Sequence, residues 1–285
     1  MHIEHPQKLE PALYVVATPI GNLRDITLRA LDVLAGADVV AAEDTRNTSY
    51  LLKHHGIHAR QLIAVHQHNE RGAAEKIAAS IRSGQSVAFV SDAGTPAVSD
   101  PGALLVQAVL AAGLRVIPVP GASAAVAALS ASGLAAPHFL FYGFLPNKSA
   151  ARRAALQELI EQPCTLVFYE APHRILECVD DLHAVLGGQR QIVLAREVTK
   201  MFETIHACSL ADAQEWLLSD SNRQRGEFVV LISGAEPATG ICAQTRATLS
   251  VLLAELPLKQ AVQLATRITG ANRSELYQLA LEMKD

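Results

Sequence analysis

Short apolar runs alternate with amphipathic stretches through the first half of the chain. An apolar run of four or five residues bounded by turn residues is typical of a buried strand, whereas apolar residues three or four positions apart are typical of a helix. The pattern predicts strands at residues 13–17, 39–42, 87–90 and 116–119, and helices at residues 28–37, 48–55, 73–82, 104–112 and 122–132. Because strands and helices alternate, residues 12–136 are predicted to form a layered α/β domain with a parallel sheet.

The second half alternates less regularly, with longer segments between its strands. The pattern there predicts strands at residues 139–144, 165–169, 192–196 and 228–232, and helices at residues 150–160, 175–186 and 211–218. A second α/β domain with a mixed sheet is therefore predicted over residues 137–236. Beyond a linker-like segment, three short helices are predicted at residues 245–255, 259–269 and 274–282. Their short connections predict a helical module, of helix-turn-helix type, over residues 241–285.

The composition of the 285 residues is that of a globular protein with more than one core, since 50% of them are hydrophobic and 18% charged. The four cysteines contain no C-x-x-C pair, which disfavours a zinc site. Neither a signal peptide nor an apolar run of transmembrane length is visible, so a reducing, cytoplasmic location without membrane contact is expected. The net charge of −4 means that any RNA-binding surface must be a local basic patch.

The loops that follow the predicted strands carry the strongest functional signals, because ligands of such sheets bind beyond the carboxyl ends of the strands. Residues 91–102 (SDAGTPAVSDPG) form a loop rich in glycine, proline and short polar side chains, and residues 120–123 (PGAS) form a second sharp turn. Both could equally be ordinary connections that cap a helix. The chain lacks G-x-G-x-x-G, G-x-x-x-x-G-K-[ST] and G-x-S-x-G, which disfavours a dinucleotide site, a P-loop and an α/β-hydrolase.

A series of motifs resembles the ribosomal RNA small subunit methyltransferase I family of the tetrapyrrole methylase superfamily. The motifs follow in order at residues 16–27, 42–46, 66–70, 91–102, 120–123, 143–146, 169–174, 196–200 and 226–228. The resemblance implies two α/β domains with S-adenosylmethionine held in the cleft between them, a helical domain from about Thr245, and a homodimer. It also implies transfer of a methyl group to the ribose 2′-hydroxyl of a cytidine in the decoding region of 16S ribosomal RNA, in the small subunit.

The resemblance also implies which residues contact the cofactor, from the loops after the strands of both domains. These residues are Pro19, Asp92, Gly94, Thr95, Pro96, Val98, Gly121, Ser123, Ala124, Tyr169, Glu170, Ala171, Gly226, Glu227 and Phe228.

A ribose hydroxyl is a weak nucleophile, so a general base or a nearby charge is expected in the site. The predicted catalytic residues are Asp44, Arg46, Glu70 and Lys200. Arg46, paired with Asp44, would steer a phosphate or the incipient alkoxide; the alternative is a structural ion pair at a helix start. The alternating His66 and His68 are expected either to contact substrate or to form an ordinary polar edge. No metal site is predicted, since no supporting ligand cluster is visible.

A basic patch that follows the predicted strand at residues 139–144 is the main candidate for RNA contact. The predicted RNA-binding residues are Lys148, Arg152, Arg153, Arg174, Lys259 and Arg273. A solvated helix start is the alternative explanation for the first three. Two other functions remain open at this stage: methylation of a corrin or sirohaem precursor, and a non-enzymatic role in ribosome assembly through the helical module.

Overall fold

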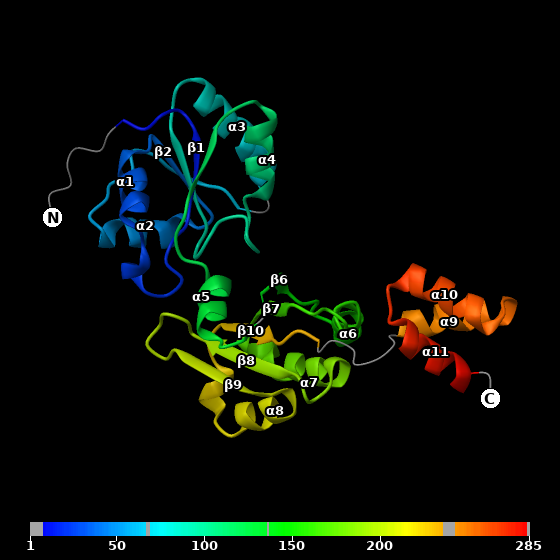
Figure 1. Cartoon of the computed structure of the whole chain (residues 1–285). Helices are drawn as coiled ribbons and strands as arrows, with labels where there is room; N and C mark the ends of the chain where they lie inside the picture. The colour runs from blue at the N-terminus through cyan, green and yellow to red at the C-terminus, as the bar shows by residue number, and fades with distance from the viewer. Residues whose placement is uncertain (1–7, 67–68, 136, 236–242, 284–285) are drawn as a thin grey trace. The chain divides into compact units, whose positions relative to one another are not determined.

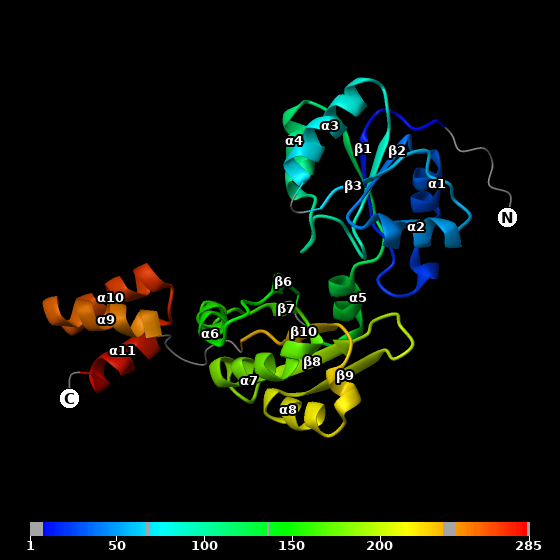
Figure 2. The same cartoon turned by 180° about the vertical axis from the view of Figure 1, so that it is seen from behind.

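The computed structural model describes residues 8–66, 69–135, 137–235 and 243–283. The chain divides into two compact units, residues 1–233 and residues 234–285 (Figures 1 and 2), each of which is described by itself. The larger unit contains two five-stranded sheets. The smaller unit contains helices only among its described residues.

The first sheet is parallel throughout and has the strand order β3-β2-β4-β1-β5. Its strands are β1 (Leu13–Val16), β2 (Val39–Ala42), β3 (Leu62–Ala64), β4 (Val87–Val90) and β5 (Val116–Val119). Every residue of β2 and β4 is buried, as expected for parallel strands covered on both faces. The carboxyl ends of β1 and β4 lie side by side at the middle of the sheet, so the loops that follow them meet.

Helices cover both faces of this sheet, which gives the layered α/β arrangement that the hydrophobic pattern predicts. They are α1 (Leu28–Gly36), α2 (Thr45–His54), α3 (Glu70–Arg82) and α4 (Ala103–Ala111), with a short 3-10 helix η1 (Leu23–Asp25) before α1. In Figures 1 and 2, α1 and α2 lie on one face and α3 and α4 on the other, and each pair contributes to a separate core cluster.

The second sheet is mixed, as predicted, with the strand order β6-β7-β10-β8-β9. Its strands are β6 (Phe139–Phe144), β7 (Thr165–Glu170), β8 (Gln191–Arg196), β9 (Thr204–Ser209) and β10 (Phe228–Ile232). Only β6 and β7 pair in parallel. The helices packed against its two faces are α5 (Ala124–Ala131) on one side, and α6 (Ser149–Gln157), α7 (Ile175–Leu186) and α8 (Leu210–Leu218) on the other. The short 3-10 helices η2 (Pro172–Arg174) and η3 (Ser221–Gln224) complete this part.

The structure differs from the predicted elements mainly at edge strands and helix starts. The sequence pattern misses β3 and β9, which are short or polar strands at sheet edges and lack a continuous apolar run. Helices α2 and α3 begin three residues before their predicted starts, because their first turns are polar. Asp44 accepts a hydrogen bond from the Arg46 N–H and thereby caps α2.

The smaller unit is a bundle of α9 (Ala243–Glu255), α10 (Leu258–Thr269) and α11 (Arg273–Glu282). Its core contains Leu249, Val262 and Leu276. Gly270 ends α10 in a left-handed conformation, and the Asn272 side chain caps α11 by accepting from the Ser274 N–H. None of the described helices is long and apolar enough to cross a bilayer.

Candidate active site

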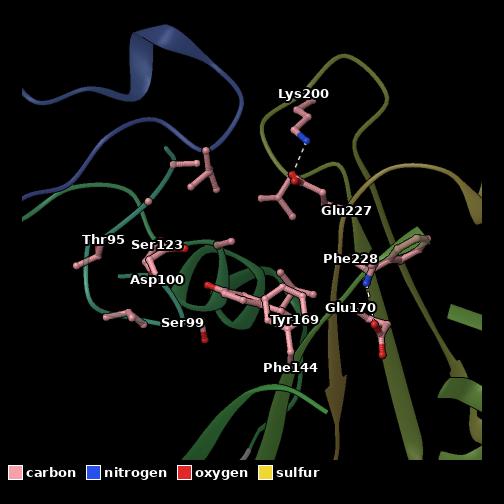
Figure 3. Close-up of a pocket in the computed structure, with 18 of the residues that line it drawn as sticks. Thr95, Ser99, Asp100, Ser123, Phe144, Tyr169, Glu170, Lys200, Glu227 and Phe228 are labelled. Atoms are coloured by element: carbon pink, nitrogen blue, oxygen red, sulfur yellow. Dashed lines mark hydrogen bonds and ion pairs between the residues drawn. The ribbon is translucent and has the colours of Figure 1, made fainter. Parts of the chain in front are cut away.

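A cavity of about 310 Å³ lies in the larger unit and is lined by loops of both sheets. Figure 3 shows residues from the β4–α4 loop, from β7 and from the loops after β8 and η3 around the same space. We call this space the donor cavity, after the methyl donor that the sequence resemblance predicts for these loops. It is lined by Ile20, Ala93, Gly94, Thr95, Val98, Ser99, Asp100, Ser123, Ala124, Phe144, Tyr169, Glu170, Ala171, Pro172, Val198, Lys200, Glu227, Phe228 and Val229.

The wall from the first sheet is shaped by an unusual backbone in residues 91–102. Ala97 and Ser99 have φ values of 67° and 62°, a region that side chains other than glycine rarely adopt. At Gly102, with φ of 127°, a Cβ atom would lie 2.4 Å from Cε1 of Phe89 in the core. These conformations turn the loop so that Val98, Ser99 and Asp100 face the donor cavity.

Glu70 anchors the C-terminal end of this loop through hydrogen bonds. Its side chain is buried, and its Oε1 atom accepts hydrogen bonds from the N–H groups of Gly102 and Leu105, both at 3.0 Å. The carboxylate therefore caps the first turn of α4 and does not line the donor cavity. Glu70, predicted to take part in the chemistry, therefore lies outside the cavity lining with Oε1 engaged by backbone donors, a placement suited to positioning the loop.

The carboxylates of Glu43, Asp92 and Asp100 lie near one another, in the segments that follow β2 and β4. Glu43 Oε2 accepts from the Asp92 N–H at 3.3 Å, and Asp92 Oδ1 accepts from the Asp44 N–H at 3.1 Å. Burial raises the pKa of Asp100 to about 6, and the charges of Glu43 and Asp92 act in the same direction. Burial also raises the pKa of Glu43. Asp100 is thus a carboxylate at the cavity wall that can hold or release a proton near neutral pH.

Asp44 and Arg46 form the ion pair that the sequence suggested, at the N-terminus of α2. Arg46 Nη2 lies 2.5 Å from Asp44 Oδ2, and Arg46 Nε donates to both oxygens. Hydrogen bonds from Arg46 lower the pKa of Asp44 to about 2. The Arg46 side chain is nevertheless 89% exposed, so its other guanidinium edge can meet a ligand.

The opposite wall, from the second sheet, carries a paired set of charges. Lys200 Nζ donates to Glu197 Oε1 at 2.8 Å and to Glu227 Oε2 at 2.7 Å (Figure 3 shows the Lys200–Glu227 pair). Burial alone would raise the pKa of Glu197, but hydrogen bonds from Lys200 and from the Glu227 N–H outweigh it and lower the pKa. Gly226, with φ of 86°, is required here, since a Cβ would lie 2.4 Å from the Glu197 side chain.

Tyr169 and Glu170 complete this wall from the end of β7. The Tyr169 hydroxyl accepts from the Ala125 N–H at 3.2 Å, and burial raises its pKa. Ser123 hydrogen bonds to Tyr169 and does not cap α5 with its side chain. Glu170 is buried and lies 3.1 Å from Arg174 Nε.

The donor cavity brings together ten of the fifteen residues predicted to contact the cofactor. These are Gly94, Thr95, Val98, Ser123, Ala124, Tyr169, Glu170, Ala171, Glu227 and Phe228. Pro19 and Asp92 line a neighbouring groove instead. Pro96, Gly121 and Gly226 line neither space. The lining residues Asp100 and Phe144 were not predicted from the sequence. Asp100 belongs to the predicted loop, but only its burial and its acidic neighbours distinguish it.

The predicted RNA patch is corrected by the structure at its centre. The Arg152 side chain is fully buried, with Nε 2.6 Å from Asp181 Oδ2, so it cannot meet RNA. Arg153 pairs with the same carboxylate while remaining half exposed. Arg174 is mostly buried and donates to the Leu145 carbonyl at 2.7 Å.

Arg152 and Arg174 hold the chain after β6 by hydrogen bonds to its carbonyl groups, whereas Lys148 and the half-exposed Arg153 remain accessible in the patch. Lys259 and Arg273 are exposed on the smaller unit.

Among the described residues, no group of three or more His, Cys, Asp or Glu side chains is arranged to hold a metal ion. His66 donates its backbone N–H to Asn69 Oδ1 and lies outside the lining of the donor cavity. His68 lies outside the described residues.

The fold is that of the tetrapyrrole methylases. The family of Tetrapyrrole (Corrin/Porphyrin) Methylases matches residues 12–214, and the RsmI C-terminal HTH domain matches residues 240–284. Among solved structures, a cobalt precorrin-4 methyltransferase aligns with a TM-score of 0.57 at 16% identity, over 79% of this chain and 95% of that chain. A uroporphyrin-III C-methyl transferase from Thermus thermophilus, complexed with S-adenyl homocysteine, aligns with a TM-score of 0.55 at 19% identity, over 78% and 97%.

The sequence relatives are more specific. A ribosomal RNA small subunit methyltransferase I from Pseudomonas aeruginosa is 53% identical over 95% of this chain and 96% of its own length. The protein of that name from Escherichia coli O157:H7 is 50% identical over 95% of each chain. The chain therefore belongs to the ribosomal RNA small subunit methyltransferase I family within the tetrapyrrole methylases.

Proposed function

We propose that this protein transfers a methyl group from S-adenosylmethionine to the ribose 2′-hydroxyl of a cytidine in the decoding region of 16S ribosomal RNA. The observation that carries the proposal is the near-full-length identity of about half the residues to methyltransferases of that name, together with a cavity between two sheets. The resemblance to the RNA enzymes also supports a homodimer in the cytoplasm.

The donor cavity fits S-adenosylmethionine in size and in lining. Gly94, Ala93, Ala124 and Ala171 provide a wall of small residues, which allows a flat adenine to approach the backbone closely. The Tyr169 and Phe144 rings add apolar surface, and Lys200 adds a cation. When bound there, S-adenosylmethionine supplies an electrophilic methyl group attached to a positively charged sulfur.

In this proposal Asp100 accepts the proton of the ribose hydroxyl. It lies at the cavity wall, and its pKa of about 6 leaves it ionised at neutral pH yet basic enough to take up a proton. Glu70 positions the loop that carries it. Lys200, held by Glu197 and Glu227, offers its remaining N–H to an oxygen of the bound ligand.

The division of labour among the parts is also proposed. Residues 12–136 and 137–236 act as two domains that share the donor, while residues 241–285 dock on RNA. Exposed Lys148, Lys259 and Arg273 would contact phosphates, and Arg46 would steer the acceptor. Because the net charge is −4, these contacts have to be local.

The test is to incubate the protein with labelled S-adenosylmethionine and either small ribosomal subunits or a tetrapyrrole, and to identify the product by nuclease digestion and mass spectrometry. We expect a 2′-O-methylated cytidine and no labelled tetrapyrrole. Label in the tetrapyrrole alone would identify a pigment methylase. Donor binding without any transfer would favour the assembly-factor alternative.

A second variant pair tests the donor cavity itself. Ala171 lines the cavity, whereas Ala150 is exposed on α6. We expect Ala171→Trp to fill the space and abolish S-adenosylmethionine binding in calorimetry, and Ala150→Trp to bind like the parent protein. Equal donor affinity in the two variants would mean that the donor binds elsewhere.

A further inference from the structure

A second hollow, the side groove, lies against the donor cavity and has no part in the mechanism above. It has a volume of about 230 Å³. The side groove is lined by Thr18, Pro19, Leu23, Asn47, Thr48, Tyr50, Leu51, Ser91 and Asp92.

One thin wall separates the two spaces. The loops after β1 and β4 are joined by a pair of backbone hydrogen bonds, Thr18 N–H to Gly94 O at 2.9 Å and Gly94 N–H to Thr18 O at 3.0 Å. Along this wall the chain alternates between the spaces: Pro19 lines the side groove and Ile20 the donor cavity. Asp92 lines the side groove and Ala93 the donor cavity in the same way. A ligand seated in the side groove therefore lies next to the place where we put the methyl donor.

The lining of the side groove suits a flat, neutral ring with polar edges. Leu23, Leu51 and Pro19 supply apolar surface, and no lysine or arginine lines the groove. Tyr50 is 66% exposed although it is a large aromatic residue on α2. Unstacked RNA bases bind to aromatic side chains in this manner.

Polar groups surround the same space. The Asn47 side chain, in the first turn of α2, offers both a donor and an acceptor, and the Thr48 hydroxyl offers both as well. Asp92 is fixed by the hydrogen bond from the Asp44 N–H at 3.1 Å. Next to Asn47 in the sequence, the exposed Arg46 side chain is available to a phosphate just outside the groove.

From this arrangement we infer that the side groove binds the unpaired nucleobase of the acceptor nucleotide, stacked on Tyr50, with Asn47 on its hydrogen-bonding edge. The base would leave its helix to enter the groove, and the attached ribose would reach the shared wall and Asp100 beyond it. The volume of about 230 Å³ lies below the roughly 300–1,000 Å³ of pockets for drug-sized ligands and suits a single base. The inference rests on the proposed function.

The test measures methylation of small ribosomal subunits by Tyr50→Ala, Tyr50→Phe and Asn47→Ala. Loss of one base–aromatic stack is expected to lower kcat/KM for subunits by about 5- to 150-fold in Tyr50→Ala. Tyr50→Phe keeps the ring and should stay close to the parent protein. The matched control is Tyr142→Ala, which removes an exposed tyrosine that lines neither space.

Donor affinity, measured by calorimetry on the same variants, separates this inference from the proposed function. Unchanged donor affinity with impaired subunit methylation by Tyr50→Ala supports the base site. Methylation equal to that of Tyr142→Ala overturns it, and so does a loss of donor affinity, which would assign the groove to the donor. If the parent protein binds the donor but methylates no subunits, the proposed function itself has failed.

An ultraviolet cross-link provides a measurement that does not depend on turnover. Irradiated complexes of the full chain with small subunits should yield a nucleotide cross-linked to the peptide that contains Tyr50, as identified by mass spectrometry. The cross-link should disappear in Tyr50→Ala and persist in Tyr142→Ala. Cross-links confined to residues outside the side groove would contradict the inference.

Discussion

The pKa values of the carboxylates are shifted in opposite directions on the two sides of the donor cavity. On the side of the first sheet, the lining residue Asp100 and the nearby Glu43, which does not line the cavity, are partly buried near other acids, and their pKa values are raised. On the side of the second sheet, Lys200 and Glu227 line the cavity, and the pKa of Glu197 behind them is lowered because it shares the Lys200 ammonium with Glu227. The carboxylates on the side of the first sheet therefore bind a proton more readily than usual, while Glu197 on the side of the second sheet stays ionised.

This difference matches the roles proposed for the two walls, proton transfer on the side of the first sheet and orientation of the ligand on the side of the second. A group that exchanges a proton must have a pKa close to the working pH, which burial next to like charges provides. A group that only orients a ligand or a loop works best when its charge is fixed by a partner. The experiments below test this contrast, beginning with the largest expected effect.

Replacing the Asp100 carboxylate is expected to have the largest effect. We expect Asp100→Asn to lower kcat by about 10²- to 10⁴-fold, the usual contribution of a general base. In the parent protein, activity should rise as the pH increases through about 6, because the carboxylate must be ionised to accept a proton. That limb of the pH profile should be absent in the variant.

The control for Asp100→Asn is Asp25→Asn, which changes an exposed acid on η1 and should leave the profile as it is. A rise near pH 6 that survives in Asp100→Asn would assign the titration to another group and remove the proposed role.

Asp181 on α7 forms a buried ion pair with Arg152 on α6. We expect Asp181→Asn to lower the free energy of unfolding by about 3–5 kcal/mol, because it leaves the buried guanidinium with only the exposed carboxylate of Glu177, at 3.6 Å, as a charged partner. Urea denaturation at neutral pH measures the change. The neighbouring Asp180 is exposed, so Asp180→Asn should stay within about 0.5 kcal/mol of the parent protein. Similar stability of the two variants would show that Arg152 finds water or another acceptor.

The ion pairs of Lys200 with Glu197 and Glu227 should contribute less to stability, because their side chains are partly exposed. We expect Lys200→Met to lower the free energy of unfolding by about 1 kcal/mol at pH 7. The lowered pKa of Glu197 stabilises the fold above its usual pKa of about 4.3, and this contribution is lost as the pH falls through the folded-state value. The gap between the parent protein and Lys200→Met should therefore close in acid.

Denaturation curves at pH 7 and at about pH 3 measure that gap for Lys200→Met. Lys76→Met, at an exposed position of α3, serves as the control. A gap that stays constant with pH would mean that Lys200 acts through packing and not through its charge.

Arg46 should give the smallest effect, since it is highly exposed and already paired with the Asp44 carboxylate. We expect Arg46→Ala to bind S-adenosylmethionine normally but to reduce the slope of log K for subunit binding against log salt by about 0.7, the value for one phosphate contact on a single strand. Asp44→Ala should leave that slope in place. An unchanged slope in Arg46→Ala, together with full methylation in both variants, would make the pair purely structural.

Much of the fold was accessible from the sequence because apolar runs report burial directly. The four fully apolar residues of β2 and of β4 predict strands covered on both faces, and the structure confirms them. Edge strands cannot be predicted in this way. Strand β9 (Thr204–Ser209) has partly buried and exposed residues instead of an apolar run, and its pairing with β8 is decided by the tertiary structure.

The site divides in a similar way. By themselves, the glycines, prolines and short polar residues of the loops predicted a ligand site beyond the strand ends, since backbone shape is a local property of such residues. Which charges face the cavity was decided only by tertiary contacts. Arg152 and Glu70 look like surface groups in the sequence, yet packing puts Arg152 against Asp181 and puts Glu70 beneath α4. Asp100 acquires its raised pKa only in the folded chain, first because folding buries its carboxyl and second because it brings Glu43, 57 residues away in the chain, close to it. Desolvation and repulsion depend on surroundings in space and not on position in the sequence.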